Sequence, residues 1–75
     1  MNKQRREELE KIKSTIESVK ESLEAVRDEE QEYADNMPEN MQGSEKHDQA
    51  EEAVSTMDEA VSSLDEALST LEEIQ

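Results

Sequence analysis

The chain of 75 residues has no cysteine, no tryptophan and no phenylalanine, and only one tyrosine, one glycine and one proline. Without cysteine there is no disulfide framework and no thiolate metal site. Aromatic residues make up 1% and charged residues 40%, which excludes a conventional core of large side chains. No stretch is apolar and long enough to span a bilayer or to resemble a signal peptide. We therefore predict a cytoplasmic protein.

The length of the chain also limits its chemistry. A chain of 75 residues forms at most one small domain, with little room for a substrate cleft. We find no nucleophile beside a base, no glycine-rich phosphate loop and no metal-ligand motif. Asp35, Glu39, His47 and Asp48 could form a metal site, but we interpret His47 as an end layer of a coiled coil. The sequence predicts that the protein is not an enzyme and has no cofactor, no metal and no catalytic residue.

Heptad repeats are the main feature that is present. Three consecutive heptads, Ala53–Glu59, Ala60–Glu66 and Ala67–Glu73, repeat one pattern, and an earlier segment has the same period. Their larger side chains alternate in steps of three and four residues, which places them on one stripe of a coiled-coil helix. The stripe residues are Leu9, Ile12, Ile16, Val19, Leu23 and Val26 in the earlier segment and Val54, Met57, Val61, Leu64, Leu68 and Leu71 in the later one.

These heptads predict two helices in one domain, over about residues 3–34 and 45–74. The connection over residues 35–44 contains Pro38 and Gly43, which interrupt helices. Ser44 is a suitable N-cap for the second helix, because its hydroxyl can accept a hydrogen bond from a backbone amide.

Residue numbering and charge predict that the helices pack antiparallel. Core residues that face each other then have numbers with a constant sum. The pairs Leu9–Leu71, Ile12–Leu68, Ile16–Leu64, Val19–Val61, Leu23–Met57 and Val26–Val54 all sum to 80. Beside the core, the first helix carries the basic row Arg6, Lys13, Lys20 and Arg27, and the second carries the acidic row Glu51, Asp58, Asp65 and Glu72. Antiparallel packing brings these rows together. The predicted fold class is all-α, an antiparallel helical hairpin.

A second stripe consists of small, uncharged side chains. Its residues are Thr15, Ser18, Ser22 and Ala25 in the first helix and Ala53, Thr56, Ala60, Ser63, Ala67, Thr70 and Ile74 in the second. Small residues allow helices to approach closely. We therefore predict that this stripe is an oligomer face and that two hairpins form a homodimer, a four-helix bundle. The alternatives are an exposed surface filled by small residues and a face that receives a helix of another protein.

Charge limits the partners. The formal net charge of −14 disfavours direct contact with nucleic acid and with anionic membranes. The second helix carries an acidic face, which consists of Asp58, Glu59, Asp65, Glu66, Glu72 and Glu73. Such a face complements a basic protein surface, and it could act as a DNA mimic in a nucleic-acid-binding groove. A solvated face that keeps the protein soluble is the plainer interpretation.

The connection is a further candidate site. Tyr33, Met37, Pro38 and Met41 lie at or next to the predicted tip of the hairpin. Methionine side chains adapt well to partner surfaces, so the tip is a candidate partner-binding site. Alternatively, these side chains cap the end of the helical core.

The basic start of the first helix, the tip Tyr33–Glu45 and the acidic heptads that begin with alanine resemble small uncharacterised proteins encoded by phages and mobile elements of Gram-positive bacteria. Small acidic phage proteins are often stoichiometric inhibitors of host enzymes or of anti-phage defence proteins. The resemblance implies a protein-binding inhibitor in the cytoplasm of a bacterial host. A structural or assembly scaffold is the remaining alternative.

Overall fold

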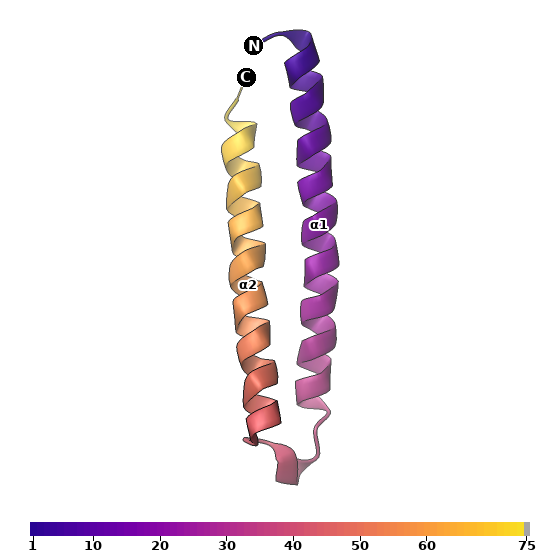
Figure 1. Cartoon of the computed structure of the whole chain (residues 1–75), viewed down its shortest axis with the longest axis vertical. Coiled ribbons are helices and arrows are strands. Elements are labelled where there is room, and N and C mark those ends of the chain that lie inside the picture. Colours follow the sequence, from indigo (N-terminus) through magenta and orange to yellow (C-terminus); the bar gives the residue numbers. More distant parts are fainter. Residues whose placement is uncertain (75) are drawn as a thin grey trace.

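Two long helices and a short turn make up the protein. The computed structural model describes residues 1–74. Helix α1 spans Lys3–Asp35, helix α2 spans Glu45–Glu72, and a 3₁₀ helix at Glu39–Met41 lies between them. The helices run antiparallel, so both ends of the chain lie at one end of the molecule and the connection lies at the other (Figure 1). The prediction of an all-helical hairpin is confirmed.

Both helices begin at a side chain that accepts a hydrogen bond from the backbone. The amide of Arg5 donates to Oδ1 of Asn2 at 2.8 Å, and the amide of His47 donates to Oγ of Ser44 at 3.3 Å. Each bond satisfies a donor that has no partner within its helix. Glu45 adds negative charge in the first turn of α2, where the helix dipole is positive. Ser44 therefore marks the start of α2, as predicted.

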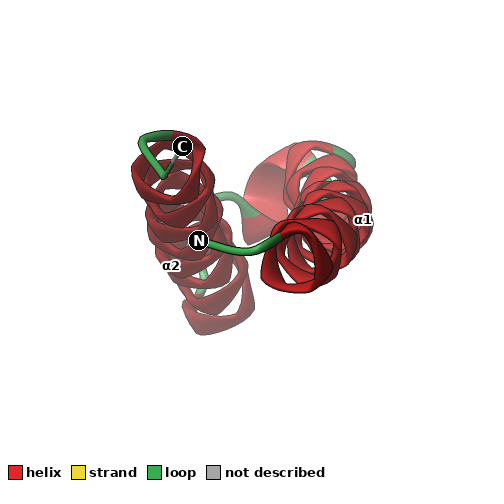
Figure 2. Cartoon of the chain, turned by 90° about the horizontal axis from the view of Figure 1, so that it is seen from above, coloured by secondary structure: helices red, strands yellow, loops and turns green. Residues whose placement is uncertain are grey.

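The hairpin is a rod with principal extents of 60 × 15 × 11 Å. Seen from its end, the described part of the chain is a single layer of two helices (Figure 2). Two helices cover each other on one side only, so few side chains become buried. The buried ones among the described residues are Ala34, Ala50, Val54, Val61 and Leu68. Neither helix, as described over residues 1–74, is long and apolar enough to cross a membrane.

Helix α2 meets α1 through the apolar stripe that its heptads predict. Val54, Val61 and Leu68 are buried, and Met57 and Leu64 are half-buried. The alternation of three and four residues therefore keeps one side of α2 against α1 over most of its length.

Helix α1 is turned differently from the prediction. Ile12, Val19 and Val26 are 49%, 51% and 53% exposed, so the prediction that they close the seam with α2 is wrong for the single chain. Basic side chains take the place beside α2: those of Lys13, Lys20 and Arg27 are 21%, 18% and 23% exposed. Their aliphatic stems cover the contact while their charged ends remain in water.

Ion pairs between the helices establish the register. Nζ of Lys20 lies 2.7 Å from Oδ1 of Asp65, and Nη1 of Arg27 lies 2.8 Å from Oδ1 of Asp58. Both pairs of residue numbers sum to 85. An antiparallel hairpin whose core pairs sum to 80 brings residues of the basic row and the acidic row together at this sum, so the ion pairs agree with the predicted register. The hydrogen bond to Asp65 raises the pKa of Lys20, and the bonds to Asp28 and then Asp58 raise the pKa of Arg27. We call this side of the hairpin the charged flank; it consists of Lys13, Lys20, Arg27, Asp58 and Asp65.

A double-mutant cycle tests this register. Lys20→Glu sets two acids against each other, and Asp65→Lys in that background brings opposite charges together again. We expect Asp65→Lys to raise the urea midpoint more in the Lys20→Glu background than in the wild type, as measured by circular dichroism. The same cycle with the exposed residues Lys11 and Glu66 (Lys11→Glu and Glu66→Lys) is the control and should show no coupling. Equal coupling in both cycles would contradict the register.

Candidate functional site

The side of the hairpin opposite the charged flank carries exposed apolar side chains. At about 100° of rotation per residue, Ile12, Val19 and Val26 lie about 80° to 120° round α1 from Lys20. Tyr33 continues this row toward the tip and is 51% exposed. The four residues recur every seven positions, so they form one line along α1.

Helix α2 contributes small residues to the same side. Ala60 precedes the buried Val61 by one residue, which places it about 100° round α2, away from Asp58 and Asp65. Ala60 and its heptad equivalent Ala67 are exposed. We call the whole surface the apolar flank; it consists of Ile12, Val19, Val26 and Tyr33 of α1, Ala53, Ala60 and Ala67 of α2, and Ile74.

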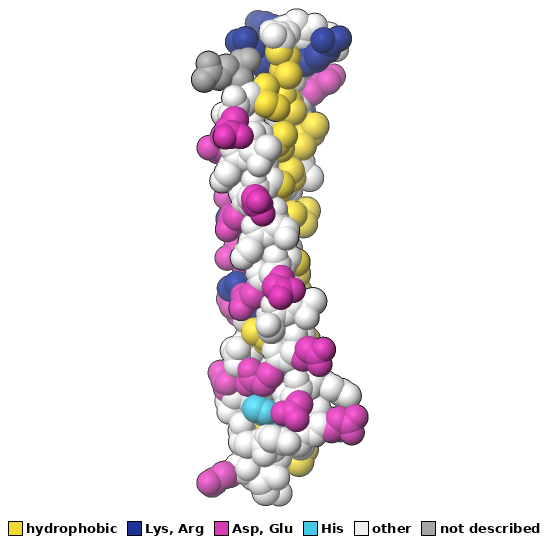
Figure 3. Space-filling view, turned by 90° about the vertical axis from the view of Figure 1, so that its left-hand side faces the viewer, with side chains coloured by type: hydrophobic (Ala, Val, Ile, Leu, Met, Phe, Trp, Pro, Cys, Tyr) yellow, Lys and Arg dark blue, Asp and Glu magenta, His cyan; other side chains and the backbone are white. Residues whose placement is uncertain are grey.

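Figure 3 shows how side chains of each type are distributed on the face of the rod that α2 forms. Hydrophobic side chains form a line along one edge in the half that holds the termini, while acidic side chains lie along the opposite edge and across the face between the edges, and basic side chains gather mainly at the end that holds the termini. The apolar arc of α1 is thus offset toward one flank, whereas that of α2 lies against α1 and is extended toward the same flank by exposed alanines. This offset is typical of a bundle in which further helices cover the open side.

The predicted stripe of small residues is divided between surfaces. Ser18 and Ala25 lie almost opposite the side of α1 that faces α2, since they are about 200° and 180° round the helix from Ile16. Ser22 and Thr56 are exposed. Each lies on a face of its helix beyond the edge of the apolar flank. The structure therefore places Ala53, Ala60, Ala67 and Ile74 next to the exposed apolar row, and it does not place Ser18 and Ala25 there.

Three hydroxyl groups of that stripe are satisfied within their own helices. The hydroxyls of Thr15, Ser63 and Thr70 donate to backbone carbonyls four residues earlier, at 3.0, 3.1 and 2.9 Å. A hydroxyl with an internal partner needs none from a neighbouring helix. These three residues can border an apolar contact without leaving an unpaired donor.

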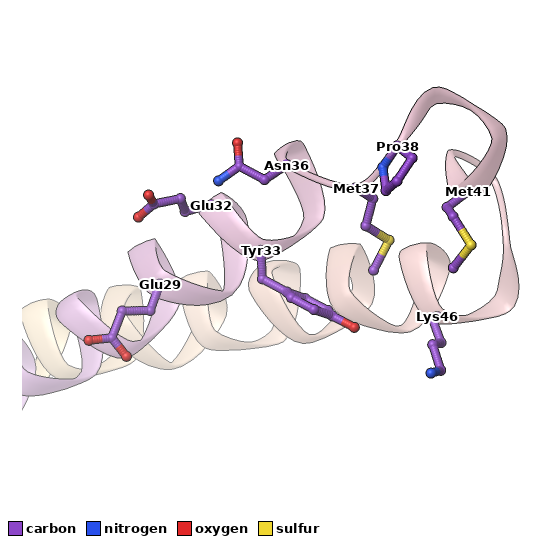
Figure 4. Close-up of a pocket in the computed structure, with 8 residues that line it drawn as sticks. All are labelled: Glu29, Glu32, Tyr33, Asn36, Met37, Pro38, Met41 and Lys46. Atoms are coloured by element: carbon purple, nitrogen blue, oxygen red, sulfur yellow. The ribbon is translucent and has the colours of Figure 1, made fainter.

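The four residues predicted at the tip come together around one cavity. It is open, has a volume of about 530 Å³ and lies where the apolar flank ends. Its walls are formed by Glu29, Glu32, Tyr33, Asn36, Met37, Pro38, Met41 and Lys46 (Figure 4). The ring of Tyr33 and the side chains of Met37 and Met41 line its apolar part, with Glu29 and Glu32 on the α1 side and Lys46 on the α2 side.

A glutamine that the sequence did not single out holds the tip together. Nε2 of Gln42 donates to the carbonyl oxygens of Met37 at 3.0 Å and of Ala34 at 3.4 Å. Ala34 is completely buried, and its carbonyl also accepts the amide of Met37 at 3.3 Å. Gly43, with φ of 81°, then turns the chain into Ser44. The turn thereby places both methionines beside Tyr33.

The predicted acidic face contains two kinds of residue. Asp58 and Asp65 are bound to Arg27 and Lys20 in the charged flank. The others are exposed and make no ion pair within residues 1–74; they are Glu59, Glu66, Glu72 and Glu73. We call these four residues the outer acids.

The imidazole of His47 lies beside two acidic side chains. Its Nε2 is 3.5 Å from Glu51 and its Nδ1 is 4.0 Å from Asp48. Asp35 and Glu39 do not join them, since the described residues include no group of three or more side chains able to hold a metal ion. His47 is half-buried at the first turn of α2, where its amide takes part in the N-cap.

Removing the Gln42 amide tests how the tip is ordered. We expect Gln42→Ala to accelerate hydrogen exchange at the Met37 and Ser44 amides, measured by NMR, because two carbonyls lose a donor. The urea midpoint should fall only slightly, since one hydrogen bond contributes about 1 kcal/mol. Gln49→Ala is the matched control, because the Gln49 amide donates to Glu45 within the first turn of α2. Unchanged exchange in Gln42→Ala would show that the tip does not depend on this side chain.

The chain matches no known protein family, no curated protein and no solved structure. Its resemblance to small phage proteins therefore stays a prediction. The candidate binding sites of the chain are therefore inferred from its own surfaces, above all from the apolar flank and the tip.

Proposed function

We propose that the protein is a non-enzymatic protein–protein interaction module that assembles through its apolar flank. The observation that carries this proposal is the row Ile12, Val19, Val26 and Tyr33, each between 49% and 53% exposed. In a chain with 40% charged residues, a solvated helix face would carry polar side chains at these positions. Apolar side chains that recur every seven residues instead match the requirements of a packed helix.

A homodimer is the smallest assembly that covers this flank. Two hairpins packed flank to flank form a four-helix bundle, in which the exposed rows of the two α1 helices and the alanines of the two α2 helices meet. A face of 60 × 15 Å has an area on the order of 900 Å², close to the roughly 800 Å² that each partner buries in a stable interface. Ala60 and Ala67 leave room for the second pair of helices to approach.

The outer acids then remain available for a target. In the dimer they lie away from the apolar flank, so a basic surface of another protein can bind them. Together with the resemblance to phage proteins, this supports a role as a stoichiometric inhibitor of a host or anti-phage defence protein. DNA mimicry has less support, because Asp58 and Asp65 are already neutralised by Arg27 and Lys20. Competition by duplex DNA for a captured target would favour mimicry.

Acidic substitutions on the apolar flank test the assembly. We expect Val19→Glu/Val26→Glu to raise the dimer dissociation constant at least about a hundredfold, because each valine loses about 1.5 kcal/mol or more of burial. Sedimentation equilibrium measures this change. Ser14→Glu/Ser62→Glu adds the same charge at exposed positions outside the flank and should leave the dimer intact. If the wild type is a monomer at tens of micromolar, the proposed assembly is wrong.

Salt dependence separates self-association from binding to a basic target. Each copy carries a net charge of −14, so two copies repel each other. Salt screens this repulsion, and we expect the dimer dissociation constant to fall between 50 and 500 mM sodium chloride. A complex with a basic protein should weaken over the same range. A dimer that dissociates as salt rises would contradict association through an apolar surface.

A further inference from the structure

We infer that the two hairpins pack antiparallel, with the Arg5 side chain of each copy in the tip cavity of the other. This inference rests on the proposed dimer and specifies its arrangement. It makes the tip cavity a site for a guanidinium group, which a second copy of the chain supplies.

The distribution of charge along the rod favours the antiparallel arrangement. Residues 1–13 contain five basic and three acidic side chains. Residues 28–52, around the tip, contain ten acidic side chains and Lys46 as the single lysine or arginine. A parallel dimer would set two such acidic tips side by side. An antiparallel dimer places each tip beside the basic N-terminal end of the other copy, which lowers the repulsion.

Arg5 lies at the far end of the apolar flank. It precedes Ile12 by seven residues, so it continues the row of Ile12, Val19, Val26 and Tyr33 on the same side of α1. Arg5 is exposed and, within the described residues 1–74, makes no ion pair. The row thus has a cationic side chain at one end and the tip cavity at the other.

The spacing of the row makes it self-complementary. If Val19 lies on the two-fold axis and faces Val19 of the second copy, Ile12 faces Val26. Arg5 then faces Tyr33 of the second copy, because Arg5 precedes Val19 by 14 residues and Tyr33 follows Val19 by 14 residues. An isologous dimer requires this reciprocity, and the two Arg5 contacts form together.

The tip cavity has the chemistry to hold a guanidinium group. The ring of Tyr33 offers a face for a cation–π contact. Glu29 and Glu32 line the α1 side of the cavity; their carboxylates extend away from Met37 and Met41 in Figure 4, and both side chains are exposed, so rotation can turn them toward a guanidinium group. Met37 and Met41 supply apolar surface for the aliphatic stem of the arginine. Lys46 lies on the other side of the cavity, apart from Glu29 and Glu32.

Distances between spin labels test the arrangement directly. The chain contains no cysteine, so Asn40→Cys allows one nitroxide to be attached at the tip of each copy. At 1.5 Å per residue, the antiparallel dimer places the two labels more than about 45 Å apart, whereas a parallel dimer places them within about 25 Å. Mixing labelled Asn40→Cys with labelled Gln4→Cys should add a population below about 25 Å. A short distance between two tip labels would overturn the antiparallel arrangement while leaving the dimer intact.

Charge reversal tests the role of Arg5. We expect Arg5→Glu to raise the dimer dissociation constant about tenfold or more, which corresponds to about 1.4 kcal/mol or more per dimer. Arg5→Glu/Glu32→Arg should restore much of the affinity. Lys3→Glu makes the same change in charge outside the row and should have a smaller effect. Equal effects of Arg5→Glu and Lys3→Glu would overturn the Arg5 site, and a wild type that is only monomeric would overturn both the arrangement and the proposed dimer.

Discussion

Helix α1 carries an apolar row and a basic row side by side, and a single neighbouring helix, α2, cannot cover both rows completely. Lys20 and Arg27 reach Asp65 and Asp58 across the contact between α1 and α2, and their stems fill one side of it. The space that they take is not available to Val19 and Val26, which lie toward the opposite side. The two flanks of the hairpin therefore have a common origin: ion pairing on one side leaves apolar side chains open on the other.

This division of the surface is the basis of the proposed assembly. A hairpin that covered all of its apolar side chains would have no reason to bind a second pair of helices. Here the open row lies beside small residues such as Ala60 and Ala67, so a neighbour can approach along the whole length of the rod. The acids that do not take part in the charged flank point elsewhere and remain solvated. Association and target binding can then use different surfaces of the same small chain.

Much of this architecture could be predicted because heptads, caps and rows of opposite charge are local patterns with direct geometric meaning. Ser44 caps α2, Lys20 meets Asp65, and the tip residues such as Met37 and Met41 lie around one cavity. The rotation of α1 could not be predicted, because the same heptad positions serve a two-helix contact and a four-helix bundle. The role of Gln42 was hidden for another reason: it depends on where the turn places the carbonyls of Ala34 and Met37.

Among residues 1–74, Ala34 and Ala50 have the least exposure, at 0% and 2%, and both lie in the part of their helix that is nearer the connection: Ala34 is second to last in α1 and Ala50 is sixth in α2. Bringing them together closes a much shorter loop than bringing Leu9 to Leu71, so the entropy lost at that step is smaller. Pairing that starts at the tip can then advance toward the termini one layer at a time, without another large loop closure. This geometry predicts an order of folding, in which the tip forms first and the ends of the helices are the first part to fray.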